Sequence, residues 1–229
     1  MSYAEWKSRY VEKKFNEKSA DKPQWALRDS TKILSKEEYR QLRELAEIKR
    51  IYLSGVKNFD GKFETVKEVI ETLSDLQNKF PNVVSGGKRL TLTLNYTMDA
   101  EDFAVTTKIR NVNLNADAYR DVDILRAEYQ KSVKEGWFVK GTDYRAIIHH
   151  EFGHIVANVY KIDSLKIACE VTGLSPKQTL DWLKKNLSAY ASSFADGGEI
   201  ISEVFADLST GKPSDFSRKF YDRVFELTR

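Results

Sequence analysis

Apolar side chains recur every three or four residues over most of this chain, a spacing that predicts amphipathic helices. The clearest stripe runs through residues 63–81, where Pro81 ends the helix. Polar residues that favour the first position of a helix mark the beginning of three others: Ser35, Asp121 and Ser175. The hydrophobic pattern is therefore mainly that of helices packed by one face.

A shorter part of the chain has a period of two. Leu90, Leu92 and Leu94 alternate with threonines, which predicts a half-buried strand. Residues 102–119 predict at least one more strand, and residues 145–229 again show only helical spacing. Helices, then a small mixed sheet, then a helical C-terminal half indicate an α+β fold.

Composition sets the expected organisation. The 229 residues suffice for one domain with a substantial core. Residues 1–55 are polar with scattered aromatics and predict a helical arm packed on the main domain, with a linker as the alternative, whereas residues 56–229 predict the main domain itself. The lone Cys169 excludes an internal disulfide and is expected to be a small buried side chain.

Charge bears on partners and location. A net charge of +3 with both signs interspersed gives no indication of a nucleic-acid partner. No apolar run approaches the roughly 18 residues of a membrane span. The charged N-terminus does not fit a secretory signal, so we expect cytoplasmic synthesis.

All three histidines lie within six positions, and His150, Glu151 and His154 spell H-E-x-x-H. On a helix, positions i and i+4 share one face, so two imidazoles can bind one zinc ion while the glutamate between them takes a proton from water that the metal acidifies. Apolar residues around the motif predict a buried helix, and Gly153 allows another backbone to come close. His149 points elsewhere on the helix and is expected to pack or to support the site rather than bind metal.

A catalytic zinc ion needs one more protein ligand, and no further histidine exists. Glu199, Glu203 and Asp207 follow one another at intervals of four in an otherwise apolar segment, so all three can share a helix face. One acid would bind the ion, and the next would orient a histidine. Two registers fit: Glu199 with Glu203, or Glu203 with Asp207.

The sequence H-H-E-F-G-H followed about 45 residues later by E-I-I-S-E-V-F-A-D-L resembles the glutamate zincins. It is similar to the peptidase domains of anthrax lethal factor and the Pro-Pro endopeptidases, and to the E-x-x-S-D-x-F helix of thermolysin-like enzymes. These resemblances imply a zincin-like fold over residues 56–229, Glu199 as the third ligand and Glu203 as the supporting acid. Asp207 would then cap the helix or lie at the edge of the site.

Residues 119–154, with G-W-F-V-K-G-T before the histidines, resemble zincin-like domains of phage minor capsid (head-morphogenesis) proteins and related toxins of mobile elements. The resemblance implies a zinc-dependent endopeptidase acting on peptide or protein, associated with a phage particle or delivered to a host. The alternative is a phage-associated structural domain that retains the fold with little turnover.

The resemblance also implies roles around the metal. Tyr190 is either a donor to the developing oxyanion or a core aromatic residue. In zincins the peptide lies along the edge strand of the sheet, which we expect in residues 110–119; Asn113 and Asn115 would face the cleft there or simply face solvent. Trp137 and Phe138 either shape a hydrophobic pocket or anchor their loop.

Overall fold

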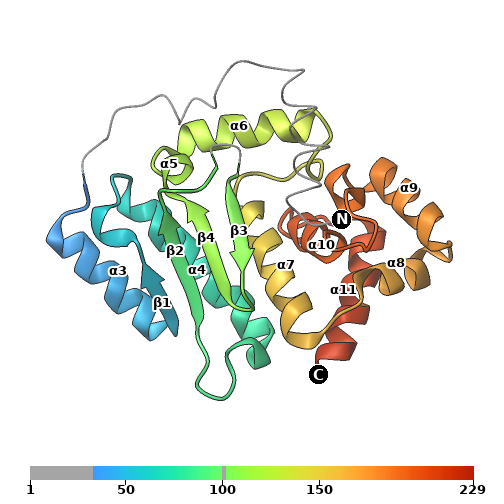
Figure 1. The fold of residues 1–229 in the computed structure, drawn as a ribbon, viewed down its shortest axis with the longest axis horizontal. Coiled ribbons are helices and arrows are strands. Elements are labelled where there is room, and N and C mark those ends of the chain that lie inside the picture. The colour runs from blue at the N-terminus through green and yellow to red at the C-terminus, as the bar shows by residue number, and fades with distance from the viewer. Residues whose placement is uncertain (1–32, 100–101) are drawn as a thin grey trace.

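A mixed sheet of four strands forms one half of the molecule. The structure, a computed structural model, describes residues 33–99 and 102–229. The strand order is β1-β2-β4-β3, in which β1, β2 and β4 run parallel and β3 is antiparallel to β4 (Figure 1). The strands are β1 (Ile51–Ser54), β2 (Leu90–Asn95), β3 (Ala104–Thr107) and β4 (Asn111–Asn115).

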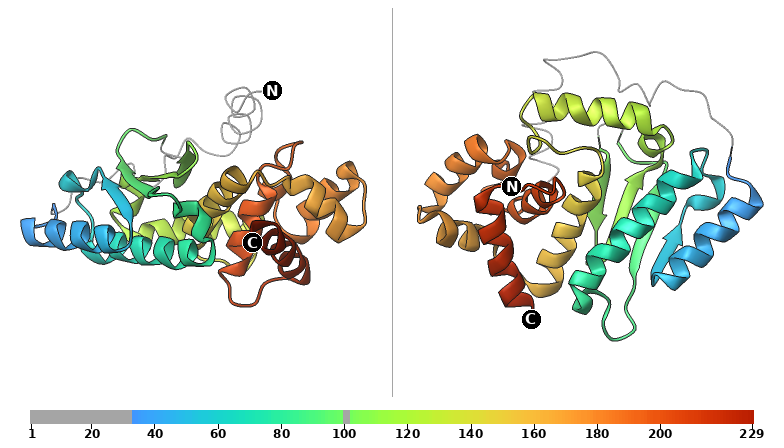
Figure 2. Two further views of the ribbon diagram at one scale, coloured as in Figure 1. Left: turned by 90° about the horizontal axis from the view of Figure 1, so that it is seen from below. Right: turned by 180° about the vertical axis from the view of Figure 1, so that it is seen from behind.

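Helices α3 (Lys36–Ile48), α4 (Phe63–Lys79) and α7 (Ala146–Tyr160) cover one face of this sheet (Figures 1 and 2). The leucines of β2 point into that layer and are buried, whereas its intervening residues are half-buried on the opposite face. The alternation in the sequence thus reflects a sheet with one apolar and one polar side.

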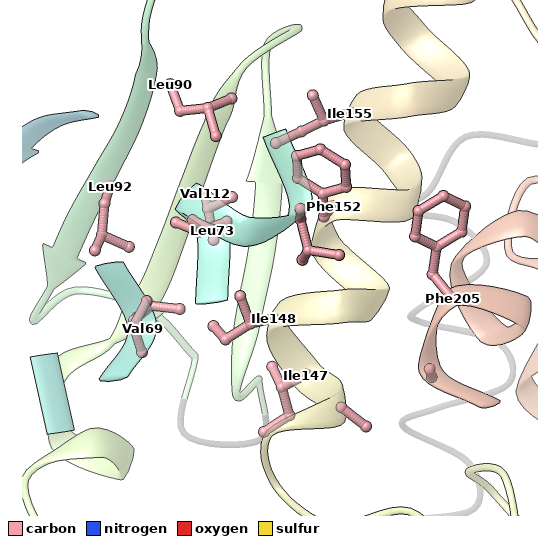
Figure 3. Packing of buried hydrophobic residues seen from close by; sticks show 14 of the residues in the cluster. Val69, Leu73, Leu90, Leu92, Val112, Ile147, Ile148, Phe152, Ile155 and Phe205 are labelled. Carbon is pink, nitrogen blue, oxygen red and sulfur yellow. The ribbon is translucent and has the colours of Figure 1, made fainter. Parts of the chain in front are cut away.

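Helix α7 links the sheet to the helical half of the molecule. Its Ile148 faces the sheet and α4 (Figure 3). Its Phe152 lies between Phe80, at the end of α4, and Phe205 of α10 (Ile200–Leu208), at ring centroid distances of 6.0 and 6.2 Å. The fully buried aromatic rings therefore join the two halves into one continuous core.

The remaining elements connect and extend this core. The short turns are η3 (Val56–Asn58), η4 (Pro81–Val84) and η5 (Tyr190–Ser192), and the further helices are α5 (Ala116–Tyr119), α6 (Val122–Lys134), α8 (Ser164–Thr172), α9 (Pro176–Asn186) and α11 (Asp215–Thr228). Among the described residues, no helix has the length and apolarity needed to cross a membrane.

The predicted α+β class is confirmed, and three predicted caps lie where expected. Ser35 forms a capping box with Glu38, Asp121 begins α6, and Ser175 precedes Pro176 at the beginning of α9. Cys169 lies in α8 and is half-buried rather than buried, beside the Thr179 hydroxyl.

The described residues on the two sides of the expected boundary at residue 55 pack together in one core. The helix predicted before it is α3, but residues 51–54 form strand β1, which pairs with β2. Leu42 and Ala46 of α3 are buried in the same core as the sheet. What the sequence predicts for residues 1–32 of the arm lies outside the described residues.

Strand β4 is not the edge strand that the sequence predicts. It lies between β2 and β3, and β3 occupies the outer position. The chain turns back after β3 through Lys108, which has a positive φ, and it is β4 of this hairpin that pairs with β2. Strand β3 is thus the edge beside α7.

Candidate metal centre

Helix α7 carries the H-E-x-x-H motif and crosses α10 at very short range. A Cβ added to Gly153 would lie 2.7 Å from Cα of Ser202 and 3.1 Å from the carbonyl oxygen of Ile201. Only glycine permits this approach, because any side chain would collide with the backbone of α10. The crossing brings the histidine face of α7 against the first turn of α10.

Three side chains meet at this crossing in a group that could hold a metal ion: His150, His154 and Glu199. Oε2 of Glu199 lies 3.2 Å from Nε2 of His150 and 3.2 Å from Nε2 of His154. Glu199 occupies the N-cap position of α10 without making a side-chain capping hydrogen bond, and its side chain instead lies against the two imidazoles of α7. All three side chains are mostly buried.

The distances fit a tetrahedral ion. Ligand atoms about 2.0–2.1 Å from a tetrahedral metal are separated from one another by roughly 3.3 Å, and the two observed separations are 3.2 Å. Oε2 of Glu199 is buried yet accepts no hydrogen bond from any described residue. A buried carboxylate oxygen in that state is costly unless a cation, either a metal ion or a protonated imidazole, lies beside it.

Glu203 lies one turn after Glu199 and supports His150. Its Oε1 is 2.9 Å from Nδ1 of His150, and the Glu203 side chain is almost completely buried. A carboxylate only accepts, so Nδ1 carries the proton and the Nε2 lone pair points toward Glu199. The contact therefore leaves the metal-binding nitrogen of His150 free of a proton when the ring is neutral.

The charges at the crossing favour a cation. Burial disfavours a charged imidazole, but the Glu199 and Glu203 carboxylates raise the pKa of His150 well above its ordinary value. Burial also acts against the Glu199 carboxylate, yet the charge of His154 and the contacts with both imidazoles hold the pKa of Glu199 below its ordinary value. The carboxylates thus stabilise positive charge at this point, which a metal ion would also provide.

Glu151 occupies the position between the two histidines. It is 5% exposed, and its Oε2 has no hydrogen-bond partner among the described residues. Its backbone carbonyl accepts a hydrogen bond of 3.0 Å from the Thr106 hydroxyl of β3. The edge strand is therefore tied to the turn of α7 that carries this acid.

Tyr190 also lies at the centre. Its ring centroid is 5.7 Å from that of His150, and the ring is half-buried. The backbone of the loop after α6 holds it: the amides of Ala189 and Tyr190 donate to the carbonyl oxygens of Gly136 and Trp137. Tyr190 is thus a neighbour of the site, as the resemblance implies.

The structure does not bring Asp207 to the centre. Its Oδ2 accepts hydrogen bonds from the backbone and hydroxyl of Ser214, where it fixes the turn into α11. Of the two registers, Glu199 with Glu203 is therefore the one observed. His149 is not part of the metal group. Burial, and to a smaller extent the charge of Lys79, lower the pKa of His149 to about 4.

The two asparagines expected to face the cleft have partners within the sheet. Asn113 donates to the Thr107 hydroxyl at 2.6 Å, on the polar face between β4 and β3. Asn115 caps α5, and its amide donates to the carbonyl oxygens of Asp99 and Asp102. Their alternation reflects the inner position of β4 and not an edge open to substrate.

Sequence reasoning missed the residues that surround the metal group. Thr106 gave no signal, because an isolated threonine in a strand is ordinary. Phe103 and Tyr129 gave no signal either, although both pack against Phe138, which the sequence pattern indicated.

Comparison with protein-family models, curated protein sequences and solved structures found no match for this chain.

Proposed function

We propose that this protein is a zinc-dependent endopeptidase with a zincin-like fold. The observation that carries the proposal is the meeting of His150, His154 and Glu199 at a spacing suited to one tetrahedral ion. Two imidazoles and one carboxylate form a donor set that is characteristic of catalytic zinc, because such sites keep a fourth position open.

In the proposed reaction, the metal ion and Glu151 have separate roles. When bound, a zinc ion supplies Lewis acidity, lowering the pKa of water toward about 7. Glu151 would accept a proton from a water molecule as the oxygen of that water adds to the peptide carbonyl carbon. Glu151 then gives the proton to the leaving nitrogen as the C–N bond breaks, so the products are a carboxylic acid and an amine.

The supporting residues fix the geometry of these steps. Glu203 holds the imidazole of His150 in one tautomer and orientation. The Tyr190 hydroxyl is the proposed donor to the oxyanion that develops on the carbonyl oxygen, since its ring lies beside His150. An extended peptide would pair with the edge strand β3, which is tied to α7 through Thr106.

Metal content and cleavage of a peptide library test the proposal directly. We expect the wild type to bind about one zinc ion per chain and to cleave. Glu151→Gln should retain zinc but cleave at least about a hundredfold more slowly, because it cannot accept the proton. Glu199→Ala should lose zinc, and Asn158→Ala, on the exposed side of α7, should behave as wild type.

Two results would contradict this function. A protein that binds zinc but cleaves no peptide would favour the alternative of a phage-associated structural domain. A protein that binds no divalent metal at neutral pH would exclude both the ion and the chemistry. Phage association itself stays a prediction from the sequence resemblance.

A further inference from the structure

Beside the metal group lies a set of aromatic rings, and the proposed hydrolytic chemistry uses only one hydroxyl of the set, that of Tyr190. We define the aromatic wall as Phe103, Phe138 and Tyr190, which come from the residue before β3, the loop after α6 and η5. Their ring centroids are linked in a chain: Phe138 lies 6.2 Å from Phe103 and 6.0 Å from Tyr190. All three rings are half-buried.

The ring of Phe138 is fixed by its packing against α6. Tyr129 of α6 stacks on it with a centroid distance of 5.0 Å and an interplanar angle of 10°. Tyr129 itself is 3% exposed, and its hydroxyl pairs with that of Thr142 at 3.0 Å. A ring fixed in this way loses little conformational entropy when a ligand packs on it.

The wall is continuous with the metal group and with the edge strand. Tyr190 joins it to His150 at 5.7 Å, and Phe103 directly precedes β3, whose Thr106 is bonded to the turn that carries Glu151. A peptide extended along β3 with its scissile bond near Glu151 would therefore carry its neighbouring side chains past these rings.

We propose that the aromatic wall is a specificity subsite that selects substrates with a large apolar or aromatic side chain close to the scissile bond. The inference rests on the proposed function. Flat rings offer their faces and edges to another ring or to an aliphatic chain, and burying such a side chain removes apolar surface from water. The wall carries no ionised group, so it provides no counter-charge for an acidic or basic side chain.

Hydrolysis provides the first test. Two peptides that differ only by Phe or Ala at a position flanking the cleaved bond are compared by kcat/KM. Wild type should prefer the Phe peptide by about tenfold or more. Phe138→Ala should bring this ratio down to within about threefold, and Phe138→Leu should give an intermediate ratio, because it keeps apolar volume without the flat ring.

The control is Tyr52→Ala, which removes an aromatic ring from β1, 58% exposed and on the opposite edge of the sheet. It should keep the wild-type ratio. Zinc content and thermal unfolding of each variant are measured in parallel. If Phe138→Ala does not fold, the ratio for Phe138→Leu decides, and an unchanged ratio in a folded variant overturns the inference.

Binding without turnover separates this inference from the proposed function. Immobilised Glu151→Gln protein is offered randomised peptide pools with Phe or Ala at one fixed position. Preferential retention of the Phe pool, lost in Glu151→Gln/Phe138→Ala, supports the wall even if wild type never cleaves. Cleavage without preference overturns the wall and leaves the peptidase. The absence of both preference and cleavage overturns both.

Discussion

At the scale of single residues, the metal group depends on which acid of α10 faces α7. Glu199 contacts both imidazoles, Glu203 fixes one of them, and Asp207 bonds to Ser214 instead. Three acids of the same chemical type and sequence spacing thus have three different roles, set by their place along one short helix.

This difference predicts unequal effects for two matched substitutions. Glu203→Gln should weaken zinc binding by about 10–100-fold, because the amide cannot accept the His150 proton in the same way as a carboxylate. Asp207→Asn should lower the melting temperature but leave zinc affinity near that of wild type, since its bonds hold only the turn into α11. Competition titration against a zinc-binding dye measures the affinities.

Equal losses of zinc affinity in the two variants would show that α10 responds as a unit, and the assigned role of Glu203 would then be wrong. Thermal unfolding of both variants without metal serves as the control, because it separates damage to the fold from loss of the His150 contact.

The sequence predicted the local part of this site and left the rest open. His150, Glu151 and His154 are related by helix periodicity alone, so their positions follow from the spacing. The partner acid depends on how α10 is rotated and where it begins, and residues four apart share a face in either register. The family resemblance favoured Glu199, and in the structure Glu199 lies against both imidazoles, just before the close crossing of Gly153 with Ile201 and Ser202.

At the scale of elements, the crossing of α7 and α10 determines whether the ligands meet. The two backbones approach at Gly153, where a methyl group would lie 2.7 Å from Cα of Ser202. Contact with backbone cannot be relieved by rotating a side chain, so the helices would have to separate.

We therefore expect Gly153→Ala to destabilise the protein by about 1–3 kcal/mol and to reduce zinc binding. Alanine favours an isolated helix over glycine by about 1 kcal/mol, so a stabilised variant would disprove the close crossing. Chemical denaturation and zinc titration measure the two effects. Asn158→Ala, exposed on the same helix, is the matched control and should change neither.

Strand identity was harder to predict than helix identity. Residues 51–54 continue the apolar spacing of the preceding helix, and nothing nearby marks them as a strand. Their partner is β2, about 40 residues further along the chain. Likewise, the polar residues of β4 resemble an edge strand, but the hairpin with β3 covers them. Local pattern does not encode pairing between distant segments.

At the scale of the whole molecule, α3 belongs to the main core. Leu42 is fully buried, whereas Ile48 on the same helix is 76% exposed. Leu42→Ala should therefore lower the free energy of unfolding by about 2–5 kcal/mol. Ile48→Ala should change it by no more than about 0.5 kcal/mol. Urea denaturation followed by tryptophan fluorescence provides the comparison.

A small effect of Leu42→Ala would mean that α3 contributes little to the main core. A large effect that also reduces zinc affinity would show that the sheet and the metal group share one cooperative unit, since α4 contacts both α3 and α7.

The ligands come from two helices that are distant in the sequence, and this has a consequence for how the chain gains its stability. An unfolded chain presents His150 and His154 without Glu199 at a fixed distance, so it binds zinc poorly. Zinc binding to the folded state would therefore add to the free energy of unfolding. If the site holds zinc as proposed, scarcity of the free metal would lower the stability of the protein together with its proposed activity, and a cell that withholds the metal would shorten the lifetime of the protein.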